Sequence, residues 1–164
     1  MVLFPERFRV TKSLLQSVRN KGYRVVFDRD FETVIESCAM VPRKGQPGTW
    51  ITDQMKEAYT DLHRDGYAHS VETYSGNDLV GGLYGVSLGG AFFGESMFHR
   101  ERDASKVALF YLVERLSEWE FDLIDVQQST AHMKSLGAED MPRTEFLVML
   151  NESLKKPTSR GNWS

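Results

Sequence analysis

The chain has 164 residues, of which 41% are hydrophobic, 26% charged and 12% aromatic, a composition typical of one globular domain. No apolar run approaches the roughly 20 residues that a membrane helix needs, and the start MVLFPERFRV is too short and too charged for a secretory signal, so we expect a cytoplasmic protein. Cys38 is the sole cysteine and no Cys/His spacing resembles a zinc site, so we expect neither a disulfide nor a metal centre.

Positive charge gathers near the start of the chain, although the formal net charge is -3. Up to residue 25, six Lys and Arg residues stand against Glu6 alone, and Lys12, Arg19 and Lys21 belong to the first predicted helix. A cationic helix face of this kind can contact nucleic-acid phosphates. A solvated surface helix has the same composition, so both interpretations remain open.

Capping residues and apolar spacing predict three helices in the first part of the chain. Thr11 and Asp30 are suitable N-caps in front of apolar stripes at helical spacing, and Gly22 and Gly66 are typical stop residues. A stretch rich in Pro and Gly interrupts the pattern. The elements predicted here are a helix over 11–23, a strand over 23–28, a helix over 30–40, a loop over 41–50 and a helix over 52–66.

The second part of the chain predicts an antiparallel meander followed by a long helix and another strand. In one sheet, a strand, a crossover helix and a second strand normally form a right-handed parallel unit, so we expect 91–98 to lie beside 121–127. The elements predicted here are strands over 68–74, 78–88 and 91–98, a turn over 75–78, a helix over 103–120, a strand over 121–127, a short helix over 129–137 and a helix over 141–156.

These elements predict one α+β domain over residues 1–156, with a mixed, mostly antiparallel sheet flanked by helices. No internal repeat or low-complexity block indicates a second domain. Residues 157–164, PTSRGNWS, carry no periodic pattern and are predicted to form a mobile tail.

The segment FFGESMF places a carboxylate, Glu95, inside an aromatic strand. An unpaired carboxylate in apolar surroundings is costly or takes up a proton, so Glu95 is expected to have a partner or a ligand. Strict alternation would put Phe93, Glu95 and Met97 on one face of the strand and Phe92 on the other. A bulge at Gly94 would instead let the aromatic wall and the carboxylate share a pocket.

The segment LIDVQ places Asp125 and Gln127 at the carboxyl end of a strand. Two residues apart on a strand, they would leave the same face and could meet Glu95 in one cleft, where open α/β arrangements hold their ligands. In the alternative interpretation, Asp125 caps the following helix and Gln127 pairs with loop backbone. The spacing does not separate these two interpretations.

Other candidate groups give weaker signals. The glycines of GGLYGVSLGG match no phosphate-loop pattern and are expected to permit close backbone approach. Trp50 is either a stacking platform for a base or part of the core. The histidines show no ligand spacing and are expected to be surface or hydrogen-bonding residues: His63, His69, His99 and His132.

Several motifs in series resemble the leucyl/phenylalanyl-tRNA-protein transferases, in order and with nearly the spacing of that family, from about residue 2 to residue 150. They are GTWIT, EAYTDLHRDGYAHSVE, LVGGLYGVSLG, FFGESMF, DASKVAL, LIDVQ and SLGAEDMPRTEFL. The resemblance implies a fold like the acyl-CoA N-acyltransferases. It also implies transfer of leucine or phenylalanine from aminoacyl-tRNA to the N-terminal Arg or Lys of acceptor proteins, which creates an N-degron and requires no metal or dissociable cofactor.

The resemblance also implies roles for individual residues. Glu95 matches the active-site glutamate that holds a substrate ammonium, and Asp125 and Gln127 match the pair that assists proton removal from the attacking amine. Because a neutral amide is a poor base, Gln127 is expected mainly to orient the substrate. The implied contacts with the aminoacyl-adenosine end are Trp50 and Tyr59, the implied Leu/Phe pocket is Leu83, Phe92, Leu109, Leu112, Leu116 and Ile124, and the implied tRNA-binding residues are Lys12, Arg19 and Lys21.

The sequence also departs from the family pattern. It begins where the second domain of the family begins, so we expect the small N-terminal domain, with its paired tryptophans, to be missing, and the acidic net charge is unfavourable for tRNA binding. Two alternatives therefore stand beside a short-form transferase. One is a non-catalytic relative that binds basic N-termini or tRNA 3' ends, and the other is an N-acyltransferase with another activated donor such as acyl-CoA.

Overall fold

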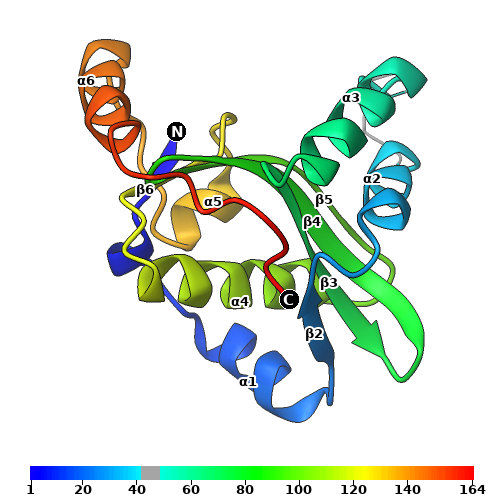
Figure 1. The fold of residues 1–164 in the computed structure, drawn as a ribbon. Helices are drawn as coiled ribbons and strands as arrows, with labels where there is room; N and C mark the ends of the chain where they lie inside the picture. Colours follow the sequence, from blue (N-terminus) through cyan, green and yellow to red (C-terminus); the bar gives the residue numbers. More distant parts are fainter. Residues whose placement is uncertain (42–48) are drawn as a thin grey trace.

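A six-stranded sheet in the order β1-β6-β5-β4-β3-β2 organises the molecule, as the computed structural model shows for residues 1–41 and 49–164 (Figure 1). The predicted loop over 41–50 lies mostly outside these described residues. The strands are β1 (Val2–Leu3), β2 (Arg24–Phe27), β3 (Ala68–Ser75), β4 (Asp78–Leu88), β5 (Ala91–His99) and β6 (Leu123–Asp125).

Helices cover both faces of this sheet. The predicted N-caps Thr11 and Asp30 are confirmed, because each side chain accepts a backbone N–H of the first helical turn, and Thr52 caps α3 in the same way. The helices are η1 (Pro5–Arg7), α1 (Lys12–Asn20), α2 (Phe31–Ala39), α3 (Asp53–Arg64), α4 (Ala104–Glu118), α5 (Ala131–Ser135) and α6 (Arg143–Ser153).

The parallel pairing predicted for the crossover unit is confirmed. β5 pairs with β6 in parallel, with Phe93 opposite Asp125, while the other neighbouring strands pair antiparallel. The carboxyl end of β6 therefore lies beside the middle of β5. This arrangement gives the mixed, mostly antiparallel sheet that the pattern predicts.

Two apolar layers lie on opposite sides of the sheet (Figure 1). One layer packs beneath α4, where Leu109, Leu112 and Leu116 are almost fully buried. The other layer packs beneath α2 and is centred on Val34 and Ile35. α4 can begin close to β4 because a side chain at Gly81 would overlap Ala104, which confirms close backbone approach as a role of the glycine-rich strand.

The end of the chain, for which the sequence predicts a mobile tail, packs against other elements through Trp163. Trp163 is only 3% exposed, and its indole stacks on the imidazole of His69 with ring centroids 3.7 Å apart. Its backbone N–H donates to the Asp28 carboxylate at 2.8 Å, and its carbonyl accepts from the Arg115 guanidinium at 2.7 Å. The sequence pattern misses this packing because a single aromatic residue in a polar segment has no periodicity.

No helix within residues 1–41 and 49–164 is both long enough and apolar enough to cross a membrane.

Candidate active site

β5 contains a bulge at Glu95. Tyr84 pairs with Ser96, whereas the next residue, Gly85, pairs with Gly94, so Glu95 has no opposite residue in the β4–β5 ladder. A bulge inserts one residue and reverses the facing of the residues that follow it. The bulge predicted at Gly94 is therefore present one residue later, at Glu95.

The bulge changes the side of the sheet that the later side chains of β5 face. Phe92 belongs to the apolar layer of α4 and Phe98 to the layer of α2, although residues six apart on a regular strand share a face. Met97 packs on the α4 side with Phe92. Gly85 accommodates this arrangement because a side chain there would overlap the Phe92 ring and the Phe93 carbonyl oxygen.

The hydroxyl of Tyr59 on α3 is the group next to the Glu95 carboxylate and can donate to it. Burial is the main cause that raises the pKa of Tyr59, and the negative charge of Glu95 raises it further, so the phenol stays protonated and donates. The Tyr59 ring also contacts Tyr84 edge-on, at 5.2 Å between centroids.

Cations do not neutralise this carboxylate. Within the described part of the chain, no Lys, Arg or His forms an ion pair with Glu95. A half-buried carboxylate with one neutral donor retains acceptor capacity for a further charged or hydrogen-bonding group.

Asp125 and Gln127 are arranged differently from the strand prediction. β6 ends at Asp125, and Gln127 has a φ of 58°, so it follows a turn and no longer alternates with the strand. The Gln127 backbone N–H donates to Oδ1 of Asp125 at 2.8 Å. This local bond corresponds in part to the alternative interpretation, because one carboxylate oxygen of Asp125 holds the turn that carries Gln127.

A cavity of about 460 Å³ lies between the bulge of β5, the end of β6 and helices α4 and α5. Glu95 and Gln127 are polar groups at its wall. Six of the other residues that the sequence resemblance assigned to the site also line it: Trp50, Leu83, Phe92, Leu109, Leu112 and Ile124. Its shape and chemistry, an apolar wall with a few polar groups, are typical of a small-molecule or side-chain site.

Three of the assigned residues lie outside this cavity. Asp125 lines a neighbouring cavity of about 380 Å³, to which Gln127 also contributes. Tyr59 lines another neighbouring cavity, of about 420 Å³, which shares Glu95 with the first. Leu116 is fully buried within the core beneath α4.

The structure adds wall residues that sequence reasoning missed. Tyr84, Met97, Thr130, His132 and Met133 line the cavity beside the expected residues. The facing of Met97 depends on the bulge, and α5 is too short to show a clear periodicity. Burial, and to a smaller extent the charge of nearby Lys106, lowers the pKa of His132, which favours a neutral imidazole at this wall.

The basic residues of the first helix are exposed on the surface. Lys12 and Arg19 lie on α1, and Lys21 follows it as the C-cap. The Lys21 ammonium donates to the Arg102 carbonyl oxygen at 2.9 Å, so part of its role is to hold the turn before α4. Within the described residues, no group of three or more His, Cys, Asp or Glu could hold a metal ion.

The chain is similar to proteins of one family over almost its whole length. A profile described as leucyl/phenylalanyl-tRNA protein transferase matches residues 2–151. Curated relatives of that name are 52% identical over 163 residues in Syntrophus aciditrophicus and 50% identical over 164 residues in Legionella pneumophila. The matches cover 99% and 100% of this chain, and 68% and 73% of those relatives.

Solved structures with a similar fold are N-acetyltransferases. A ribosomal-protein-alanine N-acetyltransferase from Brucella melitensis has a TM-score of 0.52 at 14% identity, covering 73% of this chain and 94% of the other. An aminoglycoside acetyltransferase from a soil metagenome has a TM-score of 0.50 at 14% identity, covering 84% and 90%. At this identity the likeness shows the fold alone, which confirms the prediction of an acyl-CoA N-acyltransferase-like fold.

Proposed function

The chain belongs to the leucyl/phenylalanyl-tRNA protein transferase family, and from this membership we propose that it moves leucine or phenylalanine from aminoacyl-tRNA to the N-terminal Arg or Lys of acceptor proteins. The observation that carries the proposal is the apolar cavity that ends at Glu95, a carboxylate without an ion pair in the described part of the chain. Such a site can hold an apolar donor side chain and a cationic acceptor next to each other.

The donor end of the reaction is assigned to the apolar wall. Phe92, Leu109 and Ile124 come from three different elements and line one cavity of about 460 Å³. Burial of an aliphatic or aromatic side chain in this cavity favours leucine and phenylalanine over polar amino acids. Trp50 at the rim offers a flat surface on which the terminal adenine can stack.

The acceptor end is assigned to Glu95. Its carboxylate attracts a positively charged group of the acceptor, and the neighbouring Tyr59 hydroxyl can donate to the carboxylate without neutralising its charge. The lone carboxylate therefore fits an acceptor with an N-terminal Arg or Lys.

The proposed chemistry is aminolysis of an ester. The free α-amine of the acceptor attacks the aminoacyl carbonyl carbon, an N–C bond forms, and the bond from that carbon to the ribose oxygen breaks. One proton leaves the amine nitrogen and one proton reaches the ribose oxygen. Asp125 is the proposed proton acceptor and Gln127 the proposed orienting amide, and the reaction needs positioning and proton transfer without a metal or dissociable cofactor.

The tRNA contact is assigned to the exposed cations at α1. Lys12 and Arg19 are available to phosphates, whereas Lys21 is partly engaged with the Arg102 carbonyl oxygen. Because phosphate contacts supply much of such affinity, two or three cations on an acidic protein predict weak and strongly salt-dependent tRNA binding. A charged tRNA as donor places the reaction in the cytoplasm.

The test is transfer of radiolabelled leucine or phenylalanine from charged tRNA to peptides that begin with Arg, Lys or Ala. The expected result is transfer to the Arg and Lys peptides and little to the Ala peptide. Asp125→Asn keeps an oxygen that can accept the Gln127 N–H but removes the base, so transfer should fall while folding is retained. Asp61→Asn, on the exposed surface of α3, is the matched control.

Three outcomes would contradict the proposal. Binding of charged tRNA or basic peptides without transfer would favour a non-catalytic relative. Transfer from acyl-CoA and not from aminoacyl-tRNA would favour a different N-acyltransferase. Equal transfer by wild type and Asp125→Asn would remove Asp125 from the proton-transfer step.

A further inference from the structure

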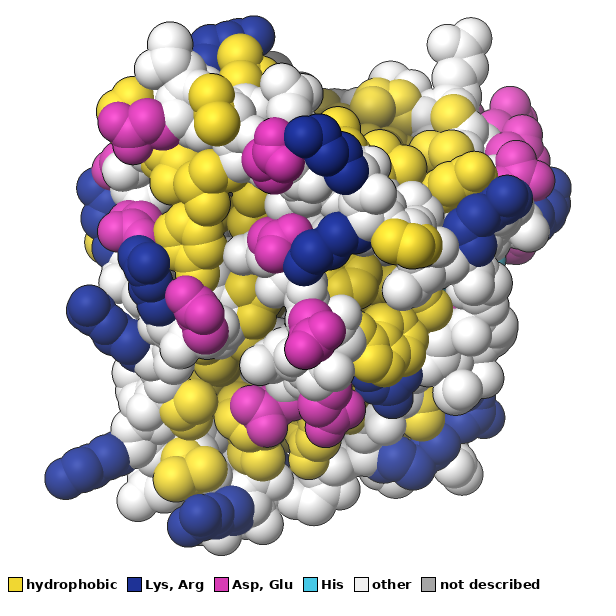
Figure 2. All heavy atoms as spheres, turned by 60° about the vertical axis from the view of Figure 1, so that its left-hand side comes forward, with side chains coloured by type: hydrophobic (Ala, Val, Ile, Leu, Met, Phe, Trp, Pro, Cys, Tyr) yellow, Lys and Arg dark blue, Asp and Glu magenta, His cyan; other side chains and the backbone are white. Residues whose placement is uncertain are grey.

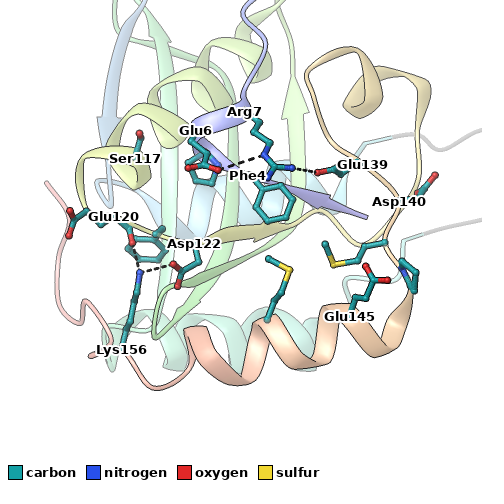
Figure 3. A pocket seen from close by; sticks show the side chains of 15 residues that line it. Phe4, Glu6, Arg7, Ser117, Glu120, Asp122, Glu139, Asp140, Glu145 and Lys156 are labelled. Carbon is teal, nitrogen blue, oxygen red and sulfur yellow. Dashed lines mark hydrogen bonds and ion pairs between the residues drawn. The ribbon is translucent and has the colours of Figure 1, made fainter.

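A second and larger groove, of about 930 Å³, lies where the residues after β1, the end of α4 and the start of α6 meet (Figure 3). We call it the acidic groove. Apolar side chains form its floor, with Phe4, Phe121 and Met149 among them. Six carboxylates line it: Glu6, Glu120, Asp122, Glu139, Asp140 and Glu145.

Cations within the groove neutralise only part of this charge. Arg7 lies 2.9 Å from Glu139 and 3.6 Å from Glu6, and Lys156 lies 2.7 Å from Asp122. With Lys134, which lies 2.6 Å from Asp140, three cations pair with four of the six carboxylates, so the groove keeps a net negative charge.

Glu120 and Glu145 are the carboxylates available to a partner. Neither forms an ion pair within residues 1–41 and 49–164, and both are exposed. Figure 3 shows them on opposite sides of the groove. A ligand with two separated positive charges can therefore contact both.

An apolar floor between carboxylates fits a basic polypeptide segment. Figure 2 shows hydrophobic side chains running down this side of the molecule, flanked by Asp and Glu together with Lys and Arg. Lys and Arg place their aliphatic stems on apolar surface and their charged ends in water, which matches this layout. The same negative charge repels nucleic-acid phosphates, so the groove is suited to protein and not to tRNA.

The acidic groove and the candidate active site have a neighbouring cavity in common. The cavity of about 380 Å³ beside Asp125 shares Gln127 with the apolar cavity and Met141 with the acidic groove. Val2 pairs with Asp125, and Pro5, three residues later in the chain, lines the groove. At a strand rise of ~3.3 Å per residue, the chain covers about 10 Å between these two residues. An extended acceptor of comparable rise spans this interval with about three residues.

We propose that the acidic groove binds the acceptor polypeptide at about its fourth to seventh residues and favours Lys and Arg there. The proposal rests on the proposed function, because it takes the acceptor N-terminus to lie at Glu95 and Asp125. Arg143 lines the cavity of about 380 Å³ between the active site and the groove. The preference for positive charge is therefore confined to the groove and does not extend to the second and third residues of the acceptor.

The test uses three peptides that begin with Arg and differ at residues five and six, which are Lys-Lys, Ser-Ser or Glu-Glu. For the wild-type protein, KM for the Lys-Lys peptide should be about threefold to tenfold lower than for the Glu-Glu peptide, with similar kcat, as two weak exposed ion pairs predict. In Glu120→Gln/Glu145→Gln the ratio should fall below about twofold. The control Glu114→Gln/Glu118→Gln removes the same charge from exposed positions outside the groove and should keep the wild-type ratio.

An equal KM for all three peptides, or the same ratio in wild type and Glu120→Gln/Glu145→Gln, would overturn the proposal. Absence of transfer to every peptide would instead contradict the proposed function. In that case, fluorescence anisotropy with labelled forms of the same peptides tests whether the groove binds them. Loss of the Lys-Lys preference in the double variant supports the proposal, and unchanged binding overturns it. Equal binding of an N-terminally acetylated Lys-Lys peptide would assign the groove to another basic partner and overturn the acceptor assignment.

Discussion

Asp28 and Glu95 are both carboxylates withdrawn from water, but their surroundings differ. Asp28, which follows β2, is 6% exposed and accepts the backbone N–H groups of Ser70 and Trp163, each at 2.8 Å. Its second oxygen lies 2.8 Å from Nδ1 of His69. Every one of these partners belongs to the folded chain, so Asp28 is a structural group.

Glu95 is half-buried, lies beside the Tyr59 hydroxyl, and lines two cavities. The comparison indicates that the number of internal partners, more than burial alone, separates a carboxylate that holds the fold from one that can bind a substrate. Variants at the two sites should therefore affect different measurements.

The largest expected effect is loss of stability at Asp28. Asp28→Ala leaves three buried donors without their acceptor and should lower the free energy of unfolding by about 3–5 kcal/mol, measured by urea denaturation. Asp61→Ala, which removes an exposed partner of Arg64, should change the unfolding midpoint little. A stable Asp28→Ala protein would contradict the structural role.

The opposite pattern is expected at Glu95. Glu95→Gln keeps the size of the side chain and an acceptor for Tyr59 but removes the charge, so kcat/KM for transfer should fall about 100-fold, or about 2.7 kcal/mol. The unfolding midpoint should remain within error of wild type. Full activity in a folded variant would remove Glu95 from the site.

A smaller effect is expected when the donor to Glu95 is removed. Tyr59→Phe retains the ring contact with Tyr84 but loses the hydroxyl, so transfer should fall about tenfold, close to the lower end of the range for a hydrogen bond to a charged group. The loss should be greater for Arg and Lys acceptors than for an uncharged acceptor. An equal loss for all acceptors would show that Tyr59 acts elsewhere than through Glu95.

The smallest effect is a pH dependence of stability from Glu72, next to the Asp28 partners. Burial raises the pKa of Glu72 above its ordinary value of 4.5, although Ser70 and the Asp30 backbone N–H partly oppose the shift. The folded state then holds the proton more tightly than the unfolded state, so this contribution to stability falls as pH rises above 4.5 through the raised pKa. The stability of Glu72→Gln, from denaturation at several pH values, should vary less over that interval, and an unchanged pH profile would contradict this assignment.

Much of the fold can be predicted from the sequence because its signals are local. Thr11, Asp30 and Thr52 each combine a capping side chain with an apolar stripe, and the parallel β5–β6 pair follows from the rule for crossover helices. Most of the apolar wall of the site, including Phe92 and Ile124, could likewise be assigned from motifs.

The remaining features depend on contacts between distant residues. Which residue of β5 bulges is decided by the fit of the Phe92 ring over Gly85 on the neighbouring strand. The turn that directs Gln127 depends on a single bond to Asp125. Trp163 is buried by surfaces from several elements, and no pattern in its own segment indicates them.

The bulge in β5 also bears on how this strand can tolerate change in length. Gly94 and Ser96 pair with adjacent residues of β4, so deletion of Glu95 would leave an uninterrupted ladder with every existing pair intact. The carboxylate thus occupies the one position in this part of β5 that strand pairing does not require. The side chain of Glu95 and the continuity of the strand are separable here, because deletion of this one residue would remove the carboxylate without loss of the sheet.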